Sequence, residues 1–73
     1  MPLPAWLTSR VLADAAIATA TARQTATNIH EQGRDHFHDP TWREALNAAH
    51  RATDKAAEIG IDPQTVLEAS KAR

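Results

Sequence analysis

Histidine and aspartate residues cluster near the middle of the chain. His36 and His38 are flanked by Asp35 and Asp39, and His30 lies six residues upstream of His36. Imidazole nitrogens and carboxylate oxygens are ligands of zinc and nickel. Asp39 is also well placed to cap a following helix, and loop histidines are commonly exposed to solvent. We therefore expect no metal and no cofactor, and keep His30, His36 and His38 as the candidate ligands.

A second group that could do chemistry is His50, Asp54 and Glu58, spaced four residues apart. In a helix this spacing places an imidazole and two carboxylates on one face, as general acid–base catalysis would need. That face is the polar, solvated one, and no nucleophile elbow, phosphate loop or Cys/His arrangement is present. We expect a non-enzymatic protein without catalytic residues; an active site formed across a dimer is the alternative.

The segment 52–69 resembles the turn of helix-turn-helix DNA-binding regulators. Ala56, Gly60, Ile61 and Val66 follow the spacing of that family's small residue, turn glycine and two apolar residues. The resemblance covers about a quarter of the chain. It implies that the last helix enters the major groove of DNA. The outward-facing, DNA-binding residues would be Gln64, Thr65, Glu68 and Lys71.

The chain departs from that family in three respects. Lys55 occupies a position that is usually apolar, and the helix before the turn would be much longer than usual. DNA-binding proteins also carry a basic face, whereas here Lys71 and Arg73 are set against Glu68 in a chain of net charge −1. DNA binding is therefore the alternative function. In the other interpretation, Gly-Ile-Asp-Pro simply ends one helix and begins the next.

These groups lie on or between helices whose limits are marked by glycine and by Asp-Pro. Asp is a preferred N-cap, Pro is favoured at the first helical position, and Gly is the usual residue after a helix end. The only two glycines, Gly33 and Gly60, each precede an Asp-Pro pair. The pattern predicts a single domain over residues 1–73 with helices at about 4–32, 40–59 and 63–72. Ile61 and Val66 flank the last start, where they predict a hydrophobic staple.

The first predicted helix is apolar on two sides. One stripe, at three- and four-residue steps, would face the second helix; it consists of Leu7, Val11, Ala15, Ala18, Ala22, Ala26 and Ile29. Trp6, Ala13, Ile17 and Ala20 lie on roughly the opposite side. Threonines within residues 19–27 favour a strand, but alanine and the flanking periodicity favour a helix. We expect the second stripe to be an interface with a partner.

Composition predicts an ordered helical protein with a thin core. Alanine supplies 16 of the 31 hydrophobic residues, while Leu, Ile, Val and Phe together supply 12. A core of this kind supports 73 residues only marginally, and without cysteine the most economical remaining support is another chain; a marginally stable monomer is the alternative. No signal peptide or membrane span is recognisable, so we expect a cytoplasmic protein that does not bind membranes.

The sequence as a whole predicts an all-α protein. We expect a long antiparallel helical hairpin plus a short C-terminal helix, paired into a dimeric helical bundle. The predicted function is non-enzymatic interaction or regulation through a helix face. The partner would be a second copy of the chain, a host protein, or both.

Overall fold

The structure, a computed structural model, describes residues 3–72. Helix α1 spans Ala5–Glu31, α2 spans Pro40–Glu58 and α3 spans Pro63–Lys71, with a short 3-10 helix, η1, at His36–His38. No strand occurs within the described residues, so the all-α class is confirmed, and the threonine-rich segment of α1 is helical. No helix in this part of the chain is long and apolar enough to cross a membrane.

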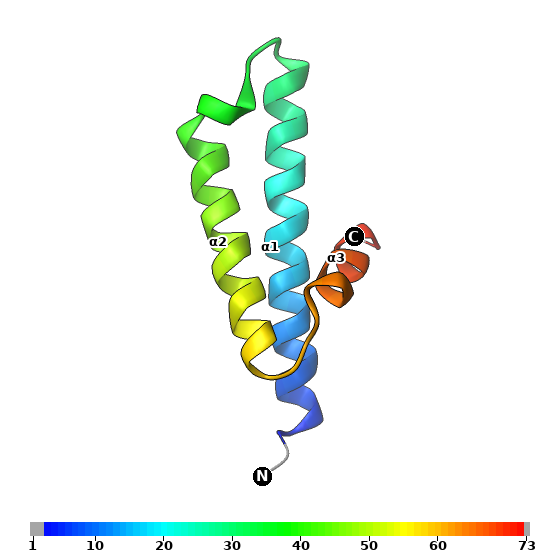
Figure 1. The fold of residues 1–73 in the computed structure, drawn as a ribbon. Helices are drawn as coiled ribbons and strands as arrows, with labels where there is room; N and C mark the ends of the chain where they lie inside the picture. Colours follow the sequence, from blue (N-terminus) through cyan, green and yellow to red (C-terminus); the bar gives the residue numbers. More distant parts are fainter. Residues whose placement is uncertain (1–2, 73) are drawn as a thin grey trace.

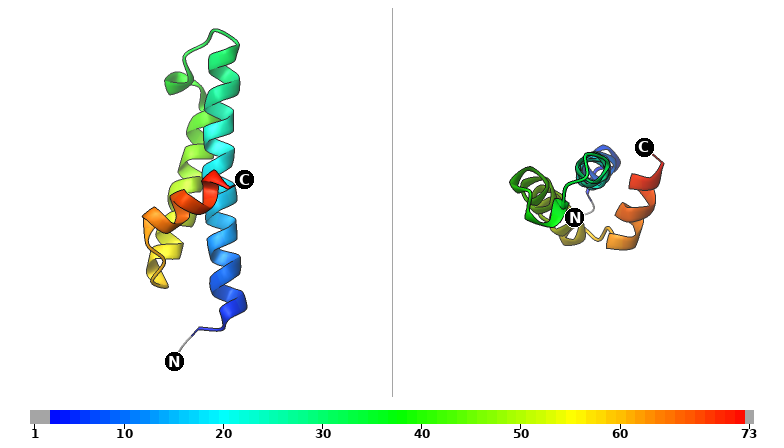
Figure 2. Two further views of the ribbon diagram at one scale, coloured as in Figure 1. Left: turned by 90° about the vertical axis from the view of Figure 1, so that its right-hand side faces the viewer. Right: turned by 90° about the horizontal axis from the view of Figure 1, so that it is seen from above.

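The three helices form an elongated molecule of 49 × 21 × 16 Å. Helices α1 and α2 lie side by side and run in opposite directions, while α3 lies beside the middle of α1 (Figure 1). Seen from above, α2 and α3 flank α1 on two sides (Figure 2). Helix α3 packs mainly against α1 and much less against α2. The far part of the α1–α2 pair therefore has no third helix over it.

Helices α1 and α2 end in the same way. Gly33 and Gly60 adopt left-handed φ angles of 76° and 90°. After α1, the N–H of Arg34 donates to the carbonyl of Ile29 at 3.2 Å; after α2, the N–H of Ile61 donates to the carbonyl of Ala56 at 3.0 Å. These are the bonds of a Schellman motif, which glycine accommodates because it has no Cβ. Local chemistry thus sets both helix ends.

Helices α2 and α3 begin at their Asp-Pro pairs. The Oδ1 atom of Asp39 accepts from the backbone N–H of Thr41 at 2.8 Å, and that of Asp62 accepts from the N–H of Gln64 at 2.7 Å. Each cap satisfies a backbone donor that has no partner within the helix. The N-cap position of α1, Pro4, makes no such side-chain bond.

The centre of the core is a cluster of Ala15, Ala56, Ile61 and Val66. Ile61 follows the end of α2 and precedes the cap of α3, so one side chain provides the hydrophobic contact at both helix limits. Val66, on the first turn of α3, is 1% exposed. Ile61 and Val66 belong to the same buried cluster, as the predicted hydrophobic staple requires.

The core is thin, because alanines make up five of its eight buried apolar side chains. One of them, Ala16, is fully buried although it lies outside the stripe predicted to face α2. Arg23, seven residues later on the same side of α1, donates to Ser70 of α3. This side of α1 therefore faces α3, and α1 is covered on two sides within a single chain.

We expect Ile61→Ala to lower the free energy of unfolding by about 2–4 kcal/mol, because it empties a buried site that joins α2 to α3. The control is Leu67→Ala on α3, which removes a side chain that is 40% exposed and should cost about 1 kcal/mol or less. Urea unfolding followed by circular dichroism measures both values. Equal losses for the two variants would contradict the central role of Ile61.

Candidate functional site

Two surfaces stand out in the described part of the chain: a groove among the helices and the outer face of α1. The groove is open to solvent and has a volume of about 350 Å³. It runs from α3 along the junction of α1 and α2. Its floor and walls consist of Thr19, Ala22 and Arg23 from α1; Trp42, Leu46, Ala49, His50 and Thr53 from α2; and Pro63, Val66 and Leu67 from α3.

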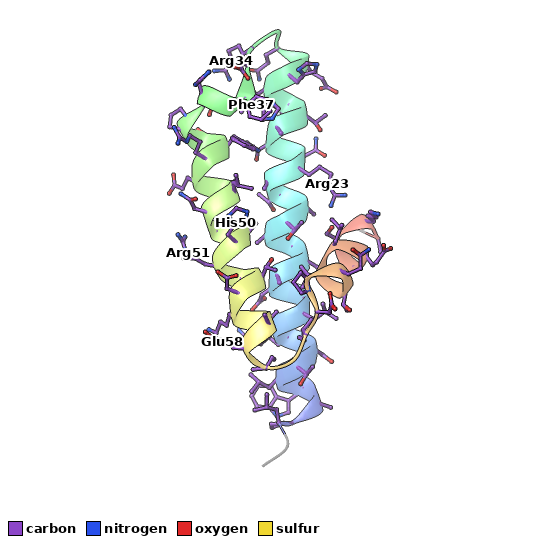
Figure 3. The ribbon with its side chains drawn as sticks, viewed as in Figure 1. Arg23, Arg34, Phe37, His50, Arg51 and Glu58 are labelled. Atoms are coloured by element: carbon purple, nitrogen blue, oxygen red, sulfur yellow. The ribbon has the colours of Figure 1, made fainter. Side chains whose placement is uncertain are left out.

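The ionisable side chains that line this groove, Arg23 and His50, are both basic, and no carboxylate lines it. They lie on either side of α1 in Figure 3. The Nη2 atom of Arg23 donates to the hydroxyl of Ser70 at 2.6 Å. Ser70 is 1% exposed and donates in turn to the carbonyl of Leu67 at 2.7 Å. A neutral partner thus orients the guanidinium without neutralising it.

Sequence reasoning missed this groove and the Arg23–Ser70 bond. Ser70 follows Val66 and Leu67 at helical spacing, which is the signal that could have placed it on the buried side of α3. The sequence did not show that Arg23 and His50 line the same groove, because they lie on different helices. Their common position depends on how the helices cross.

An aromatic cluster closes the far end of the α1–α2 pair. The ring centroids of His36 and Phe37 are 4.2 Å apart, and those of His36 and Trp42 are 4.8 Å apart. Phe37 also meets Trp42 edge to face at 5.7 Å. Edge-to-face contacts of this kind stabilise aromatic pairs beyond their buried area. The cluster holds η1 against the start of α2, so His36 serves as packing.

The candidate metal ligands are not brought into one site. Within residues 3–72, no group of three or more His, Asp or Glu side chains is arranged to hold a metal ion. His30 and His36 share a shallow hollow, but His38 faces Asp35 at 3.5 Å. Both carboxylate oxygens of Asp39 are engaged, since Oδ1 caps α2 and Oδ2 pairs with Arg34 at 3.2 Å.

The residues proposed to read DNA lie exposed on α3, around a carboxylate. Glu68 accepts from the amide of Gln64 at 2.9 Å and faces the ammonium of Lys71 at 3.7 Å. Thr65 is also exposed. The lysine that would contact a phosphate thus lies beside a negative charge, which opposes phosphate binding.

The outer face of α1, defined by Trp6, Ala13, Ile17 and Ala20, remains uncovered. Trp6 is 67% exposed and Ile17 is 47% exposed, while Ala13 and Ala20 are partly exposed. Ile17 and Ala20 also line a shallow hollow on this face. Of the four predicted interface residues, Trp6 and Ile17 are thus exposed, and Ala13 and Ala20 are partly covered by the rest of the chain.

We expect Arg23 and Ser70 to be energetically coupled by about 1 kcal/mol, because their bond ties α1 to α3 beside a buried hydroxyl. A double-mutant cycle of Arg23→Gln and Ser70→Ala, measured by urea unfolding, gives this coupling. Pairing Arg23→Gln with Thr25→Ala is the control, since the hydroxyl of Thr25 bonds only within α1. Additive effects of Arg23→Gln and Ser70→Ala would show that the bond contributes nothing.

Comparison with known proteins adds no further assignment. No protein-family model matches the chain, and no curated protein or solved structure is significantly similar to it.

Proposed function

We propose that the protein is a non-enzymatic helical interaction protein that pairs with a second copy through the outer face of α1. The observation that carries this proposal is the exposure of Trp6 and Ile17 on a helix already packed on two other sides. Large apolar side chains gathered on one exposed face mark interaction surfaces in soluble proteins. Because the alanine core buries little apolar area, the additional area buried by pairing would stabilise the chain.

The composition of the face suits a helix-to-helix contact. Trp6 offers an aromatic anchor of the type that dominates interface energies. Ala13 and Ala20 would let two helix backbones approach closely, and the hollow beside Ile17 would receive a side chain of the partner. In a two-fold pair, each copy presents the same patch. The α1–α2 hairpins of the two copies would then form a dimeric bundle.

We expect a dimer at micromolar concentration and a monomer for Ile17→Glu, because pairing would bury the new carboxylate without a partner. Such burial costs about 3 kcal/mol or more and weakens association at least about 100-fold. Light scattering and sedimentation equilibrium measure the mass.

The matched control is Ala57→Glu, which places the same side chain on an exposed position of α2. This variant should remain dimeric with an unchanged circular dichroism spectrum. A well-folded monomer of the unaltered chain at micromolar concentration would rule out self-pairing and leave a host protein as the partner.

DNA binding through α3 is the second candidate. The turn at Gly60 and the exposure of Gln64 and Thr65 favour it. In that case duplex DNA would give a strongly salt-dependent mobility shift, because phosphate contacts release counterions. The combined substitutions Gln64→Ala and Lys71→Ala should abolish the shift, and its absence at low salt would exclude this function.

A further inference from the structure

We infer that the groove among the three helices binds a small apolar carboxylate, in addition to the pairing proposed for α1. The hydrocarbon part of the ligand lies along the α2 and α3 walls, and its carboxylate faces Arg23. This site adjoins the outer face of α1, since Arg23 follows Ala20 by three residues, but it shares no residue with that face. Size, wall composition and charge each support it.

The volume suits a ligand of modest size. The open groove has a volume of about 350 Å³, at the lower end of the range of about 300–1,000 Å³ found for ligand pockets. An apolar cavity of about 150 Å³ holds a benzene molecule, so by proportion the groove holds about 14 non-hydrogen atoms. An unbranched carboxylate of ten carbons falls within that limit.

The walls are predominantly apolar. The apolar lining includes Trp42 and Leu46 on α2 and Val66 and Leu67 on α3. Leu67 is one of the few large apolar side chains of this protein that remain exposed, and a ligand in the groove would cover it. Removing such surface from water supplies the binding energy for a hydrocarbon chain.

The charge of the lining residues determines which sign of charge on a ligand the groove favours. Arg23 carries a permanent positive charge, and no lining residue is acidic. Within residues 3–72, Arg23 forms no ion pair with a carboxylate; its Nη2 is held by Ser70, so its other guanidinium N–H groups point to no acidic partner. An oriented guanidinium beside an apolar wall binds a carboxylate through charge-assisted hydrogen bonds. A neutral alcohol of equal length accepts a hydrogen bond but brings no opposite charge, and an ammonium ion is repelled by the guanidinium.

Titration with decanoate, below the concentration at which it forms micelles, tests this site. Trp6→Phe leaves Trp42 as the only tryptophan, so its fluorescence reports on the groove wall. We expect saturable binding of one decanoate per chain, with decanol and decylammonium each bound at least about tenfold more weakly. Calorimetry on the unaltered chain checks that Trp6→Phe does not alter the site.

Arg23→Gln should weaken decanoate binding about tenfold and leave decanol binding unchanged, whereas Arg23→Lys should recover most of the loss. Arg51→Gln is the matched control, because Arg51 lies on α2 outside the groove (Figure 3) and should bind decanoate normally. Leu67→Ala should weaken the binding of both decanoate and decanol. Circular dichroism establishes that each variant is folded.

Several results would overturn the inference. These are no saturable binding, equal affinity for the three probes, or equal losses for Arg23→Gln and Arg51→Gln. An affinity that falls as protein concentration rises would mean that a second copy covers the groove instead. The mass measured with decanoate present separates this site from the pairing of α1, since either can fail while the other holds.

Discussion

The position of α3 depends on Ile61, a single side chain shared by two helix limits. Ile61 donates its backbone N–H to Ala56, which ends α2, and lies one residue before Asp62, which caps α3. Its side chain then joins Val66 in the buried cluster. Because the turn is so short, the direction in which α2 ends also determines where α3 begins. The groove exists only while this joint places α3 against α1.

Alanine explains why so much apolar surface stays open. It lets α1 approach its neighbours closely, but each buried alanine removes little apolar area from water. Helix α3 has only nine residues and lies beside the middle of α1, so it leaves the adjoining α1–α2 surface uncovered. Trp42, Leu46 and Leu67 therefore line an open groove rather than a closed core. This uncovered apolar surface is what a ligand or a partner could bind.

Features set by neighbouring residues could be predicted from the sequence. The glycines and Asp-Pro pairs gave helix limits within one residue of those observed, because caps and Schellman bonds are local. Features that depend on how the helices cross could not be predicted. The burial of Ala16 was not predicted, because α3 crosses α1 on a side outside the main apolar stripe. The packing of His36 against the rings of Phe37 and Trp42 was not predicted either. Asp39, a candidate neighbour of a metal, is occupied by its cap and by Arg34.

The two surfaces share α1 but face different ways. Successive residues of a helix are rotated by about 100°, so Ile17 on the outer face and Thr19 on the groove floor point about 160° apart. Arg23 lies about 120° from Ile17 but only about 60° from Ala20, so pairing centred on Ile17 would leave the groove floor open while the edge at Ala20 lies close to Arg23. Arg23 is held by Ser70 rather than by a group on the outer face. A second copy against Ile17 would leave the groove floor open to a ligand, and the two surfaces would adjoin only where Ala20 precedes Arg23 by three residues.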